Sequence, residues 1–151
     1  MKHKNTGFTL VEILIVVIIL GILAAIVIPQ FTEASNDARV SALVSDLQTV
    51  RSQVELYKVQ HKDDYPGTVS GVWTIGNFVT HLTSKTTIDG VAGGTLGPYL
   101  QKFPTNPFNT SAAVRDATAV ADPNSEVSTE GWWFNSTTGN FGVNSTDYID
   151  R

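Results

Sequence analysis

The sequence predicts an α+β protein in which one long N-terminal helix, half of it transmembrane, packs on a small C-terminal antiparallel sheet. An apolar run over residues 8–28 is long enough to cross a bilayer. An amphipathic pattern of helical period follows it over residues 40–57. The remaining residues hold most of the aromatic side chains, glycines and prolines, a composition typical of short strands and turns.

The apolar run follows a basic leader that contains Lys2 and Lys4. A helix over Phe8–Ile28, rising about 1.5 Å per residue, spans about 31 Å, close to the thickness of a bilayer's hydrocarbon core. Because positive flanks stay in the cytoplasm, we expect the N-terminus inside and the rest of the chain outside. The run is too long for a secretory signal peptide and lacks a small-residue cleavage site before a polar mature start.

A single acid, Glu12, interrupts the apolar run. A carboxylate in hydrocarbon is costly and is by default a functional residue. Cleavage after Gly7 would create the α-amine of Phe8, and that amine could pair with Glu12 of a neighbouring copy and set the offset between helices. The alternative is that Glu12 lies near the membrane surface and snorkels to lipid headgroups.

Residues 7–12 read GFTLVE and resemble the class III signal of type IV pilins and pseudopilins. The family pattern has glycine at the cut, phenylalanine next and glutamate fifth after the cut. The resemblance implies cleavage by prepilin peptidase between Gly7 and Phe8, N-methylation of Phe8, and assembly through Phe8 and Glu12. It also implies that the chain is a substrate of enzymes and not an enzyme.

Gly21 and Pro29 stand where members of that family often carry glycine and proline. The proline ring clashes with the carbonyl of Ala25, and glycine costs about 1 kcal/mol in a helix relative to alanine. The segment is therefore the predicted soft part of the helix. The resemblance implies that it can lose helical order in a filament, and a gentle kink at the membrane exit is the alternative.

Beyond Pro29 the helix is predicted to continue to about residues 61–64, where the turn signal Tyr65-Pro66-Gly67 follows. Its apolar face covers fewer heptads than a coiled coil needs, so we expect it to pack on the C-terminal sheet. The face consists of Val40, Leu43, Leu47, Val50, Val54 and Tyr57. The predicted domains are a leader (1–7), a transmembrane or assembly half (8–29), an amphipathic half (30–64) and a globular head (65–151).

The head is predicted to contain a short helix near residues 77–84 and a hairpin over residues 131–144. In the hairpin, Trp132 and Phe134 share one face and Trp133 lies on the other. A tryptophan pair suggests a carbohydrate or other ligand, but large aromatics more often fill cores and subunit contacts. We therefore favour a core or interface role for them.

Residues 97–100 (GPYL) and 103–108 (FPTNPF) resemble a segment of the major pseudopilins of type II secretion. That group usually carries aspartate and tryptophan where Asn106 and Phe108 stand here. Tyr65-Pro66 is similar to the dipeptide that follows its long helix. This resemblance implies a structural filament subunit of a type II secretion system. A surface type IV pilin for adhesion, twitching motility or DNA uptake is the alternative, and a membrane-anchored binding module is a third.

Major pseudopilins often bind one Ca²⁺ through loop acids and carbonyls, so the resemblance raises the same question here. Oxygen ligands suit calcium, but the acids of this chain lack the fixed spacing of a calcium motif. The candidate ligands are Asp116, Asp122, Glu126 and Asp147, with Glu130 and Asp150 as further acids.

Composition excludes several other classes of function. The chain has no cysteine, hence no disulfide and no thiolate metal site, and it shows neither a nucleophile elbow nor a phosphate-binding loop. His61 and His81 have no evident ligand partners. The net charge of −4 becomes −4 − 2 = −6 when Lys2 and Lys4 leave with the leader, which argues against nucleic-acid binding.

The resemblance also implies partners and a location. The expected partners are other copies of the chain, prepilin peptidase, an inner-membrane assembly platform, minor pilins or pseudopilins, and lipid before assembly. The chain is expected to cross the inner membrane once with its N-terminus in the cytoplasm. Its head would lie in the periplasm, or outside the cell in a surface pilus.

Overall fold

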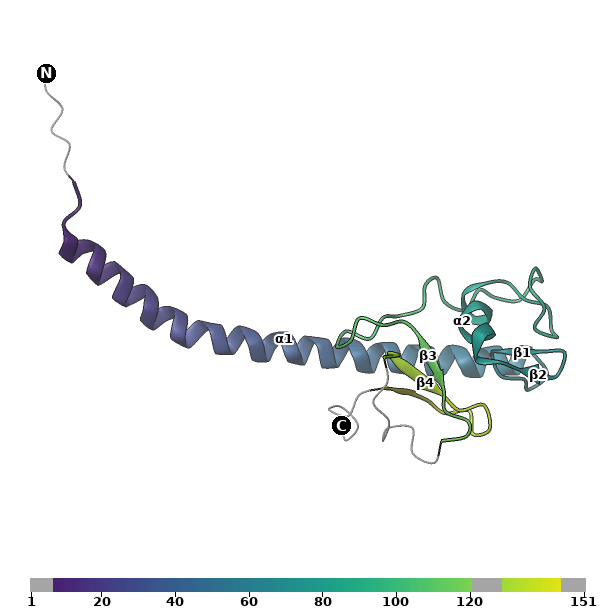
Figure 1. Cartoon of the computed structure of the whole chain (residues 1–151). Coiled ribbons are helices and arrows are strands. Elements are labelled where there is room, and N and C mark those ends of the chain that lie inside the picture. Colours follow the sequence, from purple (N-terminus) through teal and green to yellow (C-terminus); the bar gives the residue numbers. More distant parts are fainter. Residues whose placement is uncertain (1–6, 121–128, 145–151) are drawn as a thin grey trace, which may run out of the picture. The chain divides into compact units, whose positions relative to one another are not determined.

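The computed structural model describes residues 7–120 and 129–144. It confirms the α+β class: a long helix comes first, and short strands with a second helix follow (Figure 1). The chain divides into two units, Met1–Ala38 and Arg39–Arg151, and the long helix contributes to both. The elements are α1 (Leu10–Gln60), β1 (Thr68–Val69), β2 (Val72–Trp73), α2 (Ile75–Thr83), β3 (Val114–Asp116), β4 (Trp132–Phe134) and β5 (Phe141–Val143).

The first unit consists of the N-terminal part of α1 and the residues before it. Its large apolar side chains from Phe8 to Phe31 are all at least 42% exposed. An 18-residue window of α1 has a mean hydropathy of 3.3, so within the described residues this helix has the length and composition to cross a membrane. The helix runs through Pro29 without a break.

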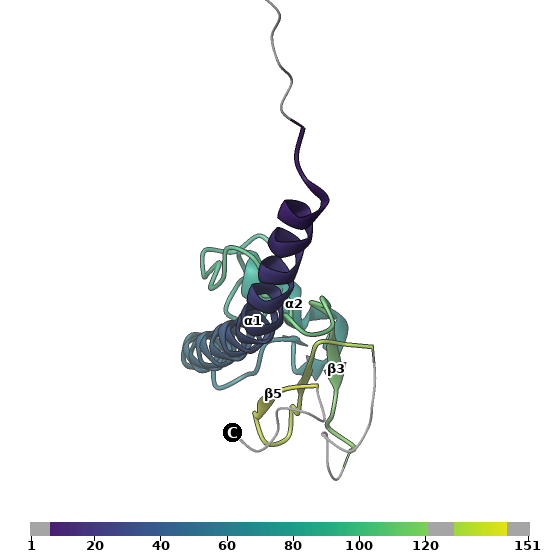
Figure 2. The ribbon, with the colours of Figure 1, turned by 90° about the vertical axis from the view of Figure 1, so that its left-hand side faces the viewer.

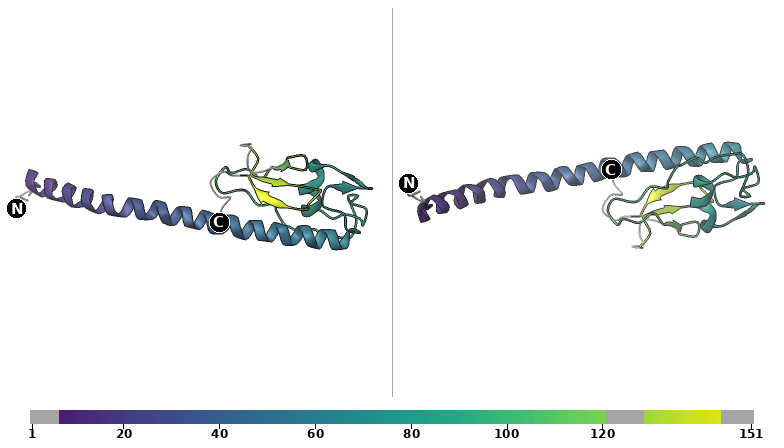
Figure 3. Two further views of the ribbon diagram at one scale, coloured as in Figure 1. Left: turned by 90° about the horizontal axis from the view of Figure 1, so that it is seen from below. Right: turned by 90° about the horizontal axis from the view of Figure 1, so that it is seen from above.

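The second half of α1 presents the predicted apolar face to the head. Leu43, Val50, Val54 and Tyr57 are buried, and Leu47 packs against the same core. Burying side chains of this size stabilises a fold by about 1.5–3 kcal/mol each. Both views in Figure 3 show α2 and the strands of the head on the same side of this part of α1. The predicted amphipathic half-helix is therefore part of the core of the head.

The larger sheet of the head has the strand order β3-β4-β5 (Figure 2). Strands β4 and β5 pair antiparallel, with Trp132 opposite Val143, and confirm the predicted hairpin. Strands β3 and β4 pair parallel, with Val114 opposite Trp132. The sheet is thus mixed, and the prediction of a purely antiparallel sheet was wrong on this point. The connection over residues 117–131 is long enough for the crossover that a parallel pair requires.

A second, two-stranded sheet precedes α2. Strands β1 and β2 pair antiparallel around Ser70 and Gly71, which both have positive φ (50° and 82°). Positive φ at both central residues is the geometry of the tight hairpin turn that matches strand twist. The hairpin was not predicted, because strands of two residues are too short to show an alternating pattern. Helix α2 confirms the predicted short helix and begins two residues earlier than expected, at Ile75.

Aromatic rings fill the core of the head. Phe78 of α2 lies 4.5 Å from Phe134, measured between ring centroids, and 6.1 Å from Phe141. Trp132 is fully buried and stacks on Phe141 at 5.4 Å, while Trp133 is half-buried on the opposite face of the sheet. The alternation of the tryptophans is as predicted, and the burial of Trp132 confirms its core role.

The segment around Asn106 closes the core from the side of β4. The Asn106 side chain is fully buried; its Nδ2 donates to the carbonyl of Gly131 (2.9 Å) and its Oδ1 accepts from the backbone N–H of Phe108 (2.9 Å). A neutral amide offers both the donor and the acceptor used here, whereas an aspartate would have no donor and would bury a charge. The asparagine therefore suits a buried structural position.

Candidate functional site

The predicted assembly acid lies in the first turn of α1, in a reciprocal hydrogen-bond arrangement with Thr9. Glu12 Oε2 accepts from the Thr9 backbone N–H (2.8 Å) and from the Thr9 hydroxyl (2.7 Å). In return, the Glu12 backbone N–H donates to Thr9 Oγ1 (3.3 Å). This is a capping box, in which a threonine before the helix and a glutamate three residues later satisfy each other's free N–H groups.

Sequence analysis missed this capping box, although its signal is present. The spacing T-x-x-E directly before an apolar run is the recognised signature of a helix N-terminus. The box explains why α1 begins at Leu10, and it gives the Glu12 carboxylate polar partners from its own chain. Both hydrogen bonds from Thr9 reach Oε2, so among the described residues Oε1 accepts none and remains open to a further donor.

The predicted cleavage site lies just before the helix. Gly7 and Phe8 are outside α1, and the Phe8 side chain is 83% exposed. A Cβ added to Gly7 would meet no atom within 4 Å. The bond between Gly7 and Phe8 therefore lies in exposed, non-helical chain, as a peptidase substrate requires. Cleavage there and N-methylation of Phe8 remain predictions.

Gly21 and Pro29 both lie inside α1. A Cβ on Gly21 would have open space around it, so no close contact in the described chain demands glycine at this position. One turn after the proline region, the Thr32 hydroxyl donates to the carbonyl of Ile28 (3.1 Å) and adds a local polar contact. The continuous helix is compatible with either expected behaviour, so softening of this segment in a filament remains a prediction.

The candidate calcium ligands are only partly described. Asp116 ends β3, is exposed, and its Oδ1 accepts from the Thr118 backbone N–H (2.8 Å). Asp122, Glu126 and Asp147 lie outside the described residues, as does Asp150. Within residues 7–120 and 129–144, no three acidic or histidine side chains gather as a metal site would require. Calcium binding therefore stays a prediction that rests on the sequence.

A buried polar cluster at the C-terminal end of α1 was also missed. His61 and His81, for which the sequence shows no evident ligand partners, are both buried and both lie against Tyr57. The two histidines are far apart in sequence and no short motif joins them, so the sequence held no usable signal for this cluster.

An apolar helix with one acid in its first turn and a small α+β head on its second half define a pilin-type subunit. Comparison with known proteins agrees with this class. A sequence profile described as the prokaryotic N-terminal methylation motif matches residues 2–28. The type II secretion system core protein G of Pseudomonas aeruginosa is 33% identical over 112 residues, which are 71% of this chain and 70% of that protein. The chain belongs to the type IV pilin and pseudopilin family.

Two further relatives represent the two branches of that family. The type II secretion system core protein G of Vibrio cholerae is 32% identical over 106 residues, covering 70% of this chain and 67% of that protein. The type IV major fimbrial protein FimA of Dichelobacter nodosus is 32% identical over 148 residues, covering 91% of this chain and 92% of that protein. No solved structure gives a significant match.

Proposed function

We propose that the chain is a structural subunit of a type II secretion pseudopilus and that it works by packing helices into a filament. The observation that carries the proposal is the exposed apolar half of α1, with a single acid in its first turn. Several relatives named type II secretion system core protein G support the choice of secretion system.

The exposed half of α1 cannot be stable in water. Soluble monomers rarely expose contiguous apolar patches larger than a few hundred Å², and here a whole helix surface is apolar. Lipid is the first available environment for it, and the same surface of other copies is the second. A subunit that moves from one environment to the other keeps its apolar side chains out of water throughout, so the transfer needs no unfolding.

Glu12 gives this packing its register. After cleavage, the Phe8 amine of an incoming subunit would meet the Glu12 carboxylate of a neighbour, through the oxygen that the capping box leaves open. Removing one member of a buried ion pair costs about 3–5 kcal/mol, because the other charge is left uncompensated. A wrong axial offset would impose that cost on every subunit, so the pair selects one offset.

The processing steps and the location follow from the same proposal. Prepilin peptidase cuts between Gly7 and Phe8, Phe8 is N-methylated, and an inner-membrane platform adds the subunit to the filament together with minor pseudopilins. The subunit waits in the inner membrane with its N-terminus in the cytoplasm and its head in the periplasm. The basic residues of the leader support this orientation.

The second candidate is a surface type IV pilin. The relative that favours it is the fimbrial protein of Dichelobacter nodosus, whose alignment extends over 91% of this chain. Both candidates use the same helix packing and the same processing. They differ in where the filament ends, in the periplasm or outside the cell.

Electron microscopy of sheared native cells, with mass spectrometry of the subunit, tests the proposal. We expect filaments whose subunits begin at an N-methylated Phe8, in a periplasmic fraction for a pseudopilus. Filaments confined to the cell surface would favour the second candidate. A subunit that still begins at Met1 in native cells and never polymerises would contradict both.

A further inference from the structure

The buried cluster around His81 joins the end of α1 to α2 and to the turn between them. His81 Nδ1 lies 2.8 Å from the Tyr57 hydroxyl and accepts from the backbone N–H of Gly67 (3.1 Å). Gly90 packs on the other side of the ring, where an added Cβ would lie 3.1 Å from His81 Cε1. One nitrogen atom therefore connects the long helix, the turn after it and the short helix of the head.

The partners determine which nitrogen of His81 carries the proton. A backbone N–H can only donate, so Nδ1 must offer a lone pair to Gly67, and the neutral ring carries its hydrogen on Nε2. The Tyr57 hydroxyl then donates to the same lone-pair side. A proton on Nδ1 would face the N–H of Gly67 directly, and neither group could turn into an acceptor.

His61 has a different hydrogen-bond arrangement. Its Nδ1 lies 2.9 Å from the Tyr57 carbonyl, which can only accept, so this nitrogen carries a hydrogen. Its Nε2 lies 2.9 Å from the Thr86 hydroxyl, which can donate to a neutral ring or accept from a charged one. At His81, by contrast, a proton on Nδ1 costs the bond from Gly67, while the Tyr57 hydroxyl can turn to accept from the charged ring.

The groups around the cluster carry little charge that would stabilise an imidazolium at His81. From α1 the ring faces Tyr57, and from the residue just after α1 it faces His61. From the turn it faces the backbone of Gly67, and from the loop after α2 it faces Gly90. Within the described part of the chain no carboxylate bonds either histidine ring. Outside this set of groups, Tyr99 and Asp64 add to the effect of burial and raise the pKa of Tyr57.

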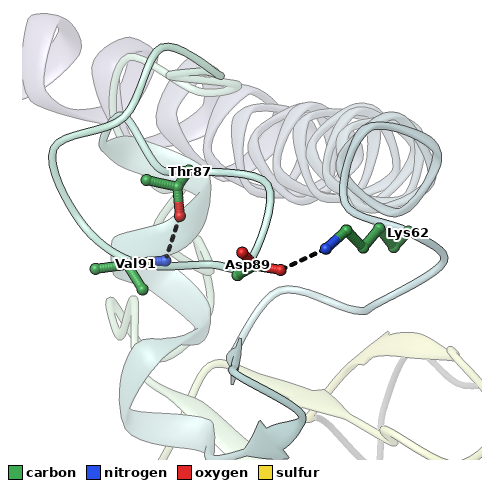
Figure 4. Close-up of polar contacts among 4 residues, drawn as sticks. All are labelled: Lys62, Thr87, Asp89 and Val91. Carbon is green, nitrogen blue, oxygen red and sulfur yellow. Dashed lines mark hydrogen bonds and ion pairs between the residues drawn. The ribbon is translucent and has the colours of Figure 1, made fainter.

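The charged side chains Lys62 and Asp89, near the cluster in sequence, pair with each other at the surface. Asp89 pairs with Lys62 at 2.6 Å, with both side chains more than half exposed (Figure 4). Such an exposed pair contributes little to stability and is screened by salt. It holds the loop after α2 near the end of α1 but does not supply a counter-charge to the buried rings.

We propose that this cluster is an acid-sensitive latch: a proton added to His81 Nδ1 removes its bond from the Gly67 N–H and releases the turn at residues 65–67 from α2. Residues 65–67 also support the β1–β2 hairpin. The carbonyl of Gly67 accepts from the Thr74 backbone N–H (3.0 Å), and the carbonyl of Pro66 accepts from Trp73 Nε1 (3.0 Å). The head is therefore closed at neutral pH and opens at this end in acid.

The direction of the pH effect follows from linkage. Burial, together with the charge of His61, lowers the pKa of His81 below its ordinary value of 6.5. In the range below that value the unfolded chain binds more protons than the folded chain, so stability rises with pH. The contribution of His81 is complete above pH 6.5 and is lost as the pH falls from there through the lower pKa of the folded state.

Hydrogen exchange of the full-length protein in detergent micelles tests the latch. Peptides that contain Gly67 are compared at about pH 7.5 and about pH 5, after correction for intrinsic exchange rates. We expect their protection factor to fall at least about tenfold at the lower pH, the fold-change that the loss of a buried hydrogen bond worth about 1.4 kcal/mol produces. Peptides from the middle of α1, around Val50, serve as the internal reference and should keep their protection.

Two variants distinguish the protonation of His81 from the effects of neighbouring groups. His81→Asn keeps an acceptor near the position of Nδ1 but cannot take up a proton, so the pH step should disappear. His61→Asn keeps a donor for the Tyr57 carbonyl and leaves His81 titratable, so the step should persist and move to higher pH, because the charge that opposes protonation of His81 is gone.

The wild-type protein keeps the test decisive if His81→Asn does not fold. Tyr57→Phe then serves as the second variant: it leaves His81 and the Gly67 N–H in place, so the step should persist. A wild-type protection factor at Gly67 that stays constant between the two pH values would overturn the proposal. So would an unchanged step in His81→Asn.

Discussion

At the scale of single residues, Glu12 combines two roles that the sequence shows only in part. In the lone chain its carboxylate completes a capping box with Thr9. In the filament it is proposed to meet the amine of a neighbouring Phe8. The two roles are compatible because a carboxylate has about four acceptor positions and the box uses one oxygen.

Glu12→Val should leave the protein in the membrane and abolish filaments. The substitution makes the helix more apolar, so insertion does not suffer, but each incoming Phe8 amine is left buried without a partner, at a cost of about 3–5 kcal/mol. Filament yield by electron microscopy and membrane content by immunoblotting measure the two effects. Ile13→Val, which keeps the charge pattern, is the control. Normal filament yield from Glu12→Val would refute the role of the acid in assembly.

Gly142→Ala should destabilise the head. A Cβ at Gly142 would lie 2.2 Å from the indole of Trp133, which covers this glycine on the outer face of the sheet. Overpacking of this kind costs about 1–3 kcal/mol. Gly76→Ala is the matched control, because its Cβ would meet nothing within 4 Å and alanine favours α2, in which it lies. Thermal melts of both variants should shift in opposite directions.

At the scale of elements, the two halves of the single helix α1 differ in their chemistry. Its first half exposes apolar side chains on every side, and its second half buries a single apolar face against the head. The second half is also where the buried aromatic and polar groups lie. Burial raises the pKa of Tyr57 to about 12, which keeps its hydroxyl protonated as a donor at every physiological pH.

Val50→Ala should cost about 2–3 kcal/mol of head stability, because Val50 is fully buried and its loss leaves a cavity. Val59→Ala, the same substitution in the same helix at a side chain that is 77% exposed, should change stability by less than about 0.5 kcal/mol. Any gain in helix propensity is shared by both variants and cancels in the comparison. Equal melting midpoints would show that the buried face of α1 does not hold the head.

At the scale of the whole molecule, the protein depends on an environment that its own chain does not supply. The head buries its aromatic core within itself, whereas the apolar half of α1 needs lipid or other copies to keep its side chains out of water. The calcium hypothesis belongs at this scale as well, since three of its four candidate ligands lie outside the described residues.

If calcium binds, melting of the full-length protein in detergent should show a higher midpoint with Ca²⁺ than with EGTA. A ligand at a hundred times its dissociation constant stabilises the folded state by about 2.7 kcal/mol. Asp116→Asn should reduce the difference, and Asp89→Asn, an acid outside the candidate set that pairs with Lys62, should not. An unchanged midpoint with EGTA would end the proposal.

Much of the architecture was predictable, because local patterns carry it. A short-range period or a turn signal predicts each of four features: the apolar run, the apolar face of α1, helix α2 and the β4–β5 hairpin. The capping box was predictable in principle, since Thr9 and Glu12 are three residues apart. The pairing of β3 with β4 was not, because strand direction depends on how a long connection returns and no local pattern records it.

The sequence alone determined that this protein has an apolar segment long enough to cross a membrane, bears one acid at the start of its helix and resembles pilins and pseudopilins. These properties depend on composition and on residues a few positions apart. Only the tertiary structure decided that Tyr57, His61 and His81 form one buried cluster and that the sheet is mixed. His81 lies 24 residues after Tyr57, and β4 follows β3 after a long connection, so packing of the head brings these residues together and no local pattern records it.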